Sequence, residues 1–367
     1  MNTTGDVRID VVPLGTVRAR GTVEAVAGGR LLVRTPGMVE VHDREAFLAG
    51  GTAPATGALR TTDRERVAPL PDGGFVVAGA ASVRAVDPDG ATRWELPHAP
   101  WHGSDRAHCA PAVSPDGRRV SVVVPVLEPD EAKAALVYDL EPDRNYTWDD
   151  LLLLDAASGG VLGRRQIRSL ASAAVQSWSP DGGAVVVSCW TAWHSWSTWW
   201  AQPRADGLRI LGGTWMHALA GFLPGSRVLT QRYAEHVFPA DDRDELGVYD
   251  LGSGDQVALL DLAELAVRPE DDEFFSAEVL DARHVLVPGR VHPDGGAPQM
   301  RHWLLSADTL RPLGRLDYPE PVGEDVTVLQ DGTWLTHDGD RLHRWRLGRA
   351  AGRRVRPAAP GPRGPAA

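Results

Sequence analysis

Short apolar runs alternate with compact polar turns along most of the chain. The clearest unit spans residues 175–201, where Ser179-Pro180-Asp181-Gly182 separates two apolar stretches. Proline sets φ at the first central turn position, aspartate bonds its own backbone, and glycine accepts the positive φ that closes a hairpin. The run that starts at Ala184 is apolar without alternation, which is typical of a strand covered on both faces. Two strands joined by a tight turn are therefore predicted here.

The same kind of turn occurs seven times between apolar stretches. Measured at the second turn residue, the spacings are 44, 44, 65, 43, 57 and 50 residues. A period near 44 with occasional insertions is typical of a four-stranded propeller blade of about 40–45 residues. The fold class predicted is therefore all-β, a seven-bladed β-propeller. The seven turns are Gly28-Gly29, Asp72-Gly73, Asp116-Gly117, Asp181-Gly182, Pro224-Gly225, Asp281-Ala282 and Asp331-Gly332.

The two ends of the chain bear on how the ring closes. After an apolar strand predicted at 342–347, the sequence becomes rich in proline, alanine and arginine, which does not favour a fourth strand. The apolar run at 7–12 precedes the first blade. We expect this run to become the outer strand of the last blade, so that closure removes the exposed sheet edges. The predicted organisation is one propeller domain, residues 1–348, followed by a disordered tail, residues 349–367.

Two of the units share a fuller motif. Residues 178–187 and 113–120 both read as an aromatic or apolar residue, then Ser-Pro-Asp-Gly, then an apolar strand. This motif resembles the WD40-like repeat of TolB-type propellers, and the turns at 72–73 and 331–332 match it in part. The resemblance implies a propeller fold over most of the chain. It implies no activity, because this repeat occurs in scaffolds, hydrolase accessory domains and secreted proteins alike.

Composition narrows the classes of function. The net charge is −11, which argues against duplex nucleic acid as the main partner. The first ten residues lack the pattern of a secretion signal, and no apolar run approaches the ~18 residues of a membrane span. Cys109 and Cys189 are the only cysteines, which fits a reducing compartment and gives neither a disulfide framework nor a paired zinc motif. We expect a cytoplasmic protein that binds neither nucleic acid nor membrane.

The long insertions fall on one face of the predicted ring. In a blade, the loops between the second and third strands share a face with the loops between blades, and we call this the loop-rich face. Loops on a rigid scaffold commonly carry binding residues. Many acids lie in these loops and attract cationic partners, although acidic loops that only maintain solubility fit the same pattern. The loops are 127–147, 191–195, 234–245 and 290–299 within blades, and 97–108, 263–274 and 318–325 between blades.

Tryptophans cluster beside this face, five of them between positions 190 and 200. Trp199 and Trp200 lie on an expected third strand, point to opposite sides, and are predicted to be core residues. Trp193 and Trp196 lie at the loop, where such side chains form a binding hot spot or a cage for a cation, packing between blades being the alternative. The predicted binding residues are Trp193, His194, Trp196, Trp101, His102, Asp105 and His236.

Histidines give a second candidate chemistry. His98, His102 and His108 lie with Asp105 and Cys109 in one loop between blades. Imidazole and carboxylate ligands hold zinc and other transition metals. Neither a His-Glu-x-x-His spacing nor a Cys-x-x-Cys pair supports such a site, however. We therefore expect no cofactor and keep these three histidines as the candidates for a divalent metal.

Catalytic motifs are missing from the sequence. It contains no Gly-x-Ser-x-Gly elbow, and no Walker or dinucleotide-binding loop. The function predicted is a non-catalytic scaffold that binds a protein or peptide, cationic in character, on an acidic face bearing Trp and His. One alternative is a propeller enzyme, similar to a lactonase or hydrolase, with a divalent metal at the central channel. Another is a small-molecule binder that holds a quaternary ammonium group in the Trp cage.

Overall fold

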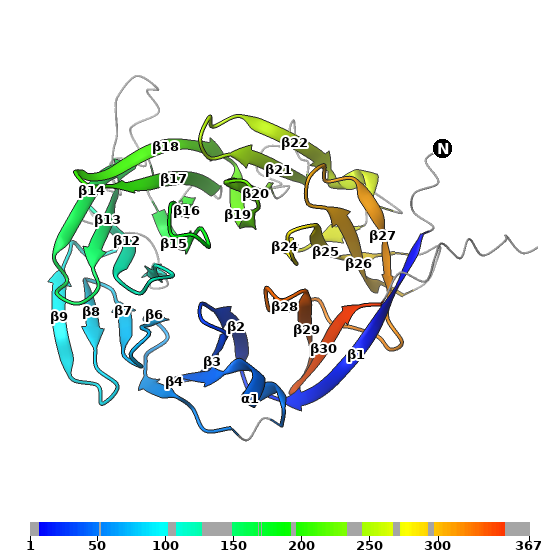
Figure 1. Ribbon diagram of the computed structural model, residues 1–367, viewed down its shortest axis with the longest axis horizontal. Helices are drawn as coiled ribbons and strands as arrows, with labels where there is room; N and C mark the ends of the chain where they lie inside the picture. Colours follow the sequence, from blue (N-terminus) through cyan, green and yellow to red (C-terminus); the bar gives the residue numbers. More distant parts are fainter. Residues whose placement is uncertain are drawn as a thin grey trace, which may run out of the picture.

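Small twisted sheets stand in a ring around a central opening (Figure 1). The computed structural model describes residues 7–50, 53–101, 108–126, 149–167, 169, 171–191, 196–232, 244–266, 272–292 and 297–348. Within these ranges the strands form four sheets of four strands, one of five and one of nine. Each small sheet runs from an inner strand beside the opening to an outer strand at the rim. This is the architecture of a β-propeller.

Five sheets follow one another along the chain. The first contains β2 (Thr22–Val26), β3 (Arg30–Thr35), β4 (Met38–Asp43) and β5 (Gly57–Arg60). The second contains β6 (Arg66–Pro69), β7 (Phe75–Ala78), β8 (Ser82–Val86) and β9 (Thr92–Pro97). The third contains β11 (Ala112–Val113), β12 (Arg119–Pro125), β13 (Asp149–Asp155) and β14 (Val161–Ile167). The fourth contains β15 (Ala171–Trp178), β16 (Val185–Thr191), β17 (Trp196–Arg204) and β18 (Gly207–Trp215). The fifth contains β19 (His217–Leu223), β20 (Arg227–Arg232), β21 (Glu245–Asp250) and β22 (Gln256–Asp261).

A short strand at the end of the predicted loop 97–108 was not anticipated. β10 (His108–Cys109) adds to the inner edge of the fourth sheet, where it pairs in parallel with β15. Helical structure in the described residues is limited to α1 (Arg44–Leu48) and the 3-10 turn η3 (Leu262–Glu264). No helix in this part of the chain has the length and apolar character needed to cross a membrane.

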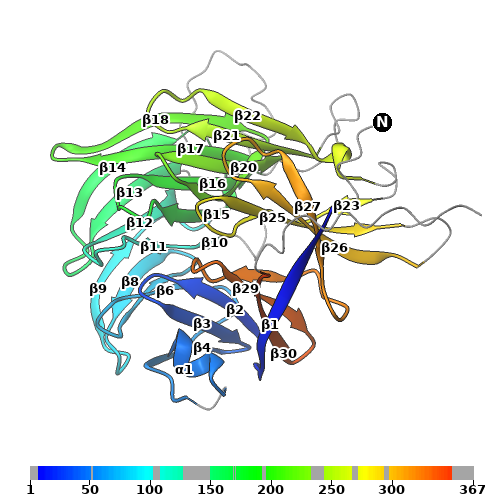
Figure 2. The ribbon, with the colours of Figure 1, turned by 45° about the vertical axis from the view of Figure 1, so that its right-hand side comes forward.

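The nine-stranded sheet contains the closure of the ring. Its strands are β23 (Glu273–Phe274), β24 (Glu278–Val279), β25 (His284–Val291), β26 (Gln299–Ser306), β27 (Pro312–Asp317), β1 (Arg8–Arg18), β30 (Arg341–Leu347), β29 (Thr333–Asp338) and β28 (Val326–Val328). β1 pairs in parallel with β27 at its start and antiparallel with β30 over the rest of its length, so it lies between them (Figure 2). The predicted pairing of the N-terminal strand with the last strand is confirmed. The strand is longer than the predicted run 7–12, because it continues past Pro13 through an irregularity in register.

Side-chain hydrogen bonds hold the predicted turns in place. The hydroxyl of Ser179 donates to the carboxylate of Asp181 over 2.6 Å and accepts from the backbone N–H of Ala184 over 2.8 Å. Asp181 also accepts from the backbone N–H of Gly183, and Gly182 has the positive φ of 68° that the turn requires. These bonds satisfy polar groups that the hairpin itself leaves unpaired. The turn chemistry predicted from the sequence is therefore present.

The core lies between neighbouring sheets, as the unbroken apolar runs predict. Val185, Val186 and Val187 are all fully buried, with their side chains on alternating sides of the fourth sheet. Trp200 is buried and belongs to a cluster with the fifth sheet, whereas Trp199 is half-buried and packs against the cluster of the second to fourth sheets. The two tryptophans therefore serve opposite sides of the sheet, as predicted.

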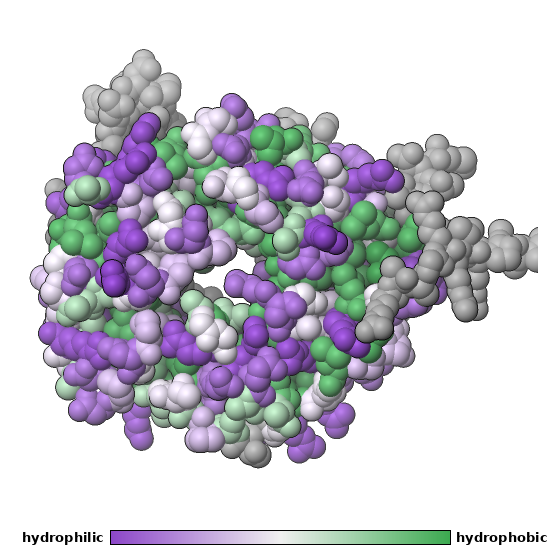
Figure 3. All heavy atoms as spheres, viewed as in Figure 1, coloured by the Kyte–Doolittle hydropathy of each residue, from purple (hydrophilic) through white to green (hydrophobic). Residues whose placement is uncertain are grey.

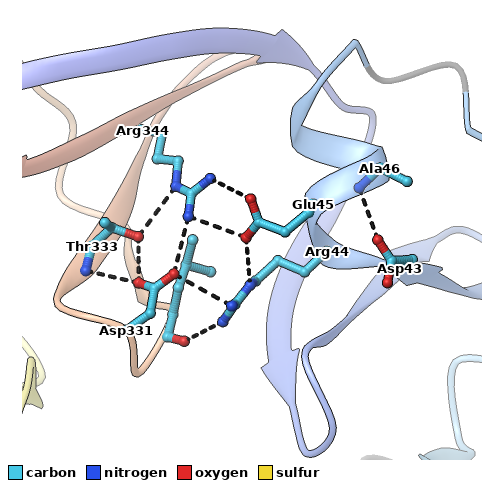
Figure 4. Close-up of polar contacts among 8 residues, drawn as sticks. Asp43, Arg44, Glu45, Ala46, Asp331, Thr333 and Arg344 are labelled. Carbon is cyan, nitrogen blue, oxygen red and sulfur yellow. Dashed lines mark hydrogen bonds and ion pairs between the residues drawn. The ribbon is translucent and has the colours of Figure 1, made fainter.

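A group of ion pairs joins the first sheet to the last (Figure 4). Arg44 and Glu45 come from α1, Asp331 from the turn between β28 and β29, and Arg344 from β30. Arg344 lies 3.1 Å from Glu45 and 3.0 Å from Asp331, and Arg44 lies 3.4 Å from Asp331. Burial disfavours the charge of Asp331, but hydrogen bonds from Thr333 and the positive charges of the two arginines outweigh it and hold the pKa of Asp331 below its usual range.

Replacing Asp331 with asparagine is expected to lower the free energy of unfolding by about 2 kcal/mol at pH 7, because two arginines lose their shared partner. A carboxyl whose pKa is lower in the folded than in the unfolded protein stabilises the fold at pH values above its unfolded pKa of about 3.9. This stabilisation is lost as the pH falls through the pKa of the folded state. The difference from wild type should therefore shrink below about pH 4. Urea unfolding at pH 7 and pH 3 measures it.

Asp308→Asn is the matched control, because Asp308 is an exposed carboxylate paired with the single arginine Arg227. It should cost less than about 0.5 kcal/mol. Equal losses in the two variants would contradict the role assigned to Asp331.

Candidate functional site

Two cavities in the described part of the ring meet at one residue. The larger, of about 1870 Å³, is lined by the inner strands and by the Pro-Asp-Gly turns, and it forms the central channel. The smaller, of about 700 Å³, is lined by residues that border the loop-rich face. Glu278 of β24 lines both. The opening at the centre of the ring is visible in Figure 3.

Aromatic and acidic side chains dominate the smaller cavity, which we call the aromatic pocket. Its volume is in the usual range of sites for small ligands or peptide segments, about 300–1000 Å³. In the described residues, its lining contains three carboxylates and no basic side chain. The lining residues that matter below are Trp190, Trp196, Phe274, Phe275, Glu278, Glu324 and Asp325.

The tryptophan wall comes from one hairpin. Trp190 on β16 and Trp196 on β17 are paired across the strands at the end of the hairpin next to residues 192–195. Their rings lie 5.3 Å apart at 67°, an edge-to-face arrangement that aromatic pairs prefer. Both side chains are half-buried. Trp196, one of the predicted binding residues, therefore forms part of the pocket wall.

Another wall is a short segment before β24, held by the buried side-chain amide of Gln231. Gln231 at the end of β20 is 1% exposed. It donates to the carbonyl of Phe275 over 3.1 Å and accepts from the N–H of Ala277 over 2.7 Å. The N–H of Phe275 in turn donates to the carbonyl of Pro288 over 3.0 Å. This backbone is therefore fixed before any ligand arrives, which lowers the entropy cost of binding.

Arg290 connects this wall to acidic residues at the edge of the pocket, which we call the acidic rim. Arg290 on β25 lies 2.8 Å from Glu273 and 2.7 Å from Glu324. Its guanidinium also lies over the ring of Phe275, 5.3 Å from the centroid. Glu324 is thereby held at the pocket, while the neighbouring Asp325 is exposed. The rim keeps an excess of negative charge.

Glu278 has an unusual environment for a carboxylic acid. No hydrogen bond or ion pair joins its side chain to any of the described residues. The side chain is half-buried, and its solvent contact is through the cavities that it lines. This burial raises the pKa of Glu278 to about 8. Strongly shifted acids in clefts mark candidate functional sites.

Glu278→Gln is expected to alter stability in a pH-dependent way. The folded pKa lies above the unfolded value of about 4.3, so the contribution of Glu278 to stability is lost as the pH rises toward 8. Glutamine stays neutral and avoids this loss. The variant should unfold at a similar temperature to wild type at pH 5 and at a higher temperature at pH 9, as measured by thermal unfolding.

The control for that measurement is Glu95→Gln on the outer strand β9, where the side chain is exposed. It should show no such pH dependence. A difference between Glu278→Gln and wild type that is the same at pH 5 and pH 9 would contradict the assignment.

Among the other predicted site residues that the structure describes, none lines the aromatic pocket. Trp101 is 9% exposed and belongs to the core cluster of the second to fourth sheets. His98 stacks edge-on to Trp101 with its ring 6.4 Å away, and burial lowers the pKa of His98. His108 lies on β10. Outside the described residues lie Trp193, His194, His102, Asp105, His236 and the predicted tail 349–367.

No metal centre emerges in the part of the chain that the structure describes. Within it, no three His, Cys, Asp or Glu side chains lie close enough together to hold an ion. Of the metal candidates His98, His102 and His108, the structure describes the side chain of His98 alone, and its Nδ1 lies 2.7 Å from the carbonyl of Ala99. The metal assignment stays a prediction.

Comparison with known proteins shows the fold. No family model matches this chain, and no curated protein matches its sequence. BamB from Moraxella catarrhalis, a β-propeller, is 10% identical with a TM-score of 0.55, over 92% of this chain and 99% of that chain. A chain in the crystal structure of the mitotic checkpoint complex is 12% identical with a TM-score of 0.52, over 91% and 94%. At these identities the likeness supports a propeller fold and says nothing about activity.

Proposed function

We propose that this chain is a non-catalytic propeller that binds a protein or peptide on its loop-rich face. The observation that carries the proposal is the aromatic pocket at the channel mouth. There Trp190, Trp196 and Phe275 line the same cavity as Glu278, which has no ion-pair partner among the described residues. Binding energy in interfaces concentrates in such partly desolvated aromatic anchors. The fold neighbour in the mitotic checkpoint complex is part of a protein assembly, which supports the same class of function.

The proposal extends to the organisation of the chain. Five sheets supply one blade each, and β24–β27 and β28–β30 with β1 supply two more, which supports seven blades in one domain of residues 1–348. The scaffold needs no cofactor for this role. Cys109 and Cys189 are buried free thiols, which supports a reducing, cytoplasmic location.

A peptide library tests the docking function. Peptides selected on the wild-type protein are measured by fluorescence polarisation against Trp196→Ala/Phe275→Ala, with thermal unfolding to verify the fold. We expect binding at least tenfold weaker, because two anchors of the pocket are removed. Trp215→Ala is the matched control, since Trp215 is 55% exposed on the outer strand β18 and does not line the pocket. Its affinity should stay within twofold of wild type.

Two results would overturn this function. Equal binding by the double variant would place the docking site elsewhere. Cleavage of a bound peptide, followed by mass spectrometry, would show catalysis and reject the scaffold.

A further inference from the structure

One carboxylate that lines the aromatic pocket, that of Glu278, lacks a cationic partner among the described residues. Glu278 lies where the pocket and the channel meet, and it has no partner among the described residues. A carboxylate that is partly withdrawn from water is stabilised when a cation pairs with it. The side-chain amide of Gln231 binds the backbone of Ala277, the residue before Glu278, and both its oxygen and its nitrogen are hydrogen-bonded. Glu278, by contrast, keeps its carboxylate available to a ligand in the cavities that it lines.

We propose that the aromatic pocket recognises one arginine side chain of the partner, with its guanidinium paired to Glu278 between the Trp and Phe walls. This rests on the proposed docking function and gives the partner a chemical signature. The lining supplies three carboxylates and no basic side chain among the described residues, and only Glu324 of the three pairs with Arg290, so the pocket and a cationic side chain are complementary in charge. Trp and Phe rings add attraction, because a cation over an aromatic face is stabilised by the ring quadrupole.

The protein's own structure shows this chemistry at the same wall. Arg290 lies over Phe275 while it pairs with both Glu273 and Glu324. A planar guanidinium can stack on a ring and bond to carboxylates in the same plane, whereas an ammonium group does so as a point charge. The pocket offers an incoming side chain the same combination, with Trp190 and Trp196 as rings and Glu278 as carboxylate.

The higher pKa of arginine also favours it over lysine. A lysine placed in surroundings of low polarity loses its proton readily, and a neutral amine beside a neutral Glu278 gains little. Arginine stays charged under all these conditions, so it can draw Glu278 into its ionised form. The pocket volume of about 700 Å³ exceeds the needs of one side chain and admits the peptide backbone on either side.

Isothermal titration of the full-length protein at pH 7.5 tests the proposal with three peptides. They are acetyl-Gly-Arg-Gly-amide, the lysine analogue, and the citrulline analogue, which keeps the shape of arginine without its charge. We expect the arginine peptide to bind at least fivefold more tightly than the lysine peptide and at least tenfold more tightly than the citrulline peptide. Equal affinity for arginine and citrulline would overturn the proposal.

Variants assign the interaction to Glu278. Glu278→Gln should weaken arginine binding at least tenfold, whereas the matched control Glu95→Gln should leave it within twofold. Glu278→Asp keeps the charge on a shorter side chain and should retain part of the affinity, which separates loss of the ion pair from loss of the fold. Unchanged binding by Glu278→Gln would show that this carboxylate is not the recognition group.

The two proposals fail in distinguishable ways. If library peptides without basic residues compete for the pocket and lose affinity with Trp196→Ala/Phe275→Ala, docking stands and arginine recognition is rejected. If neither the library peptides nor the arginine peptide responds to pocket variants, the docking function itself is rejected.

Discussion

Removal of residues 7–18 is expected to abolish cooperative unfolding of this protein at 25 °C. The deleted strand, β1, makes three register pairs with β27 and seven with β30, and buries Val11 and Val17. At about 1 kcal/mol for each hydrogen bond and about 2 kcal/mol for each buried valine, the loss is comparable with the whole stability of a typical domain, about 5–15 kcal/mol. It also exposes two sheet edges that promote aggregation.

Size-exclusion chromatography and urea unfolding check this result. Deletion of residues 352–367 is the control and should leave the unfolding midpoint unchanged, because the sequence predicts no strand there. A synthetic peptide of residues 7–18 added in trans should restore a folded monomer, and the same peptide with Val11→Asp and Val17→Asp should not. A truncated protein that unfolds like wild type would show that β1 is dispensable.

Trp345→Ala is expected to lower the free energy of unfolding by about 4 kcal/mol. Trp345 on β30 is fully buried between Pro13 of β1 and Trp334 of β29. Its ring lies 5.1 Å from that of Tyr318, nearly perpendicular, and its Nε1 donates to the hydroxyl of Thr336 over 2.9 Å. Truncation leaves a cavity where the closing strand packs, and it leaves the Thr336 hydroxyl without its donor.

The measurement is urea unfolding monitored by circular dichroism. Trp345→Phe should show an intermediate loss, because the ring is retained and the hydrogen bond is not. Trp215→Ala should cost less than about 0.5 kcal/mol, since that side chain is 55% exposed. A loss for Trp345→Ala no larger than for Trp215→Ala would contradict the packing described here.

Part of the candidate site is predictable from the sequence. Trp196 lies at the end of a hairpin whose turn and strands have clear local patterns, so its place at the loop-rich face follows from them. Glu324 and Asp325 likewise fall in the predicted loop 318–325. Glu278 and Phe275 have no such signal. Their position depends on the amide of Gln231, which is 46 residues away from Ala277 in sequence, and on the pairing of β24 with β25.

The sequence by itself determines the repeating unit and the closure of this ring. Turns of Ser-Pro-Asp-Gly and apolar strands are local, because a few neighbouring residues set their φ angles and their burial. The tertiary structure alone decides which side chains meet at the channel mouth. There the circular arrangement brings Trp196, Phe275 and Glu324 together from three separate segments of the chain. No local pattern encodes that contact, because its energy arises only after every strand has found its place in the ring.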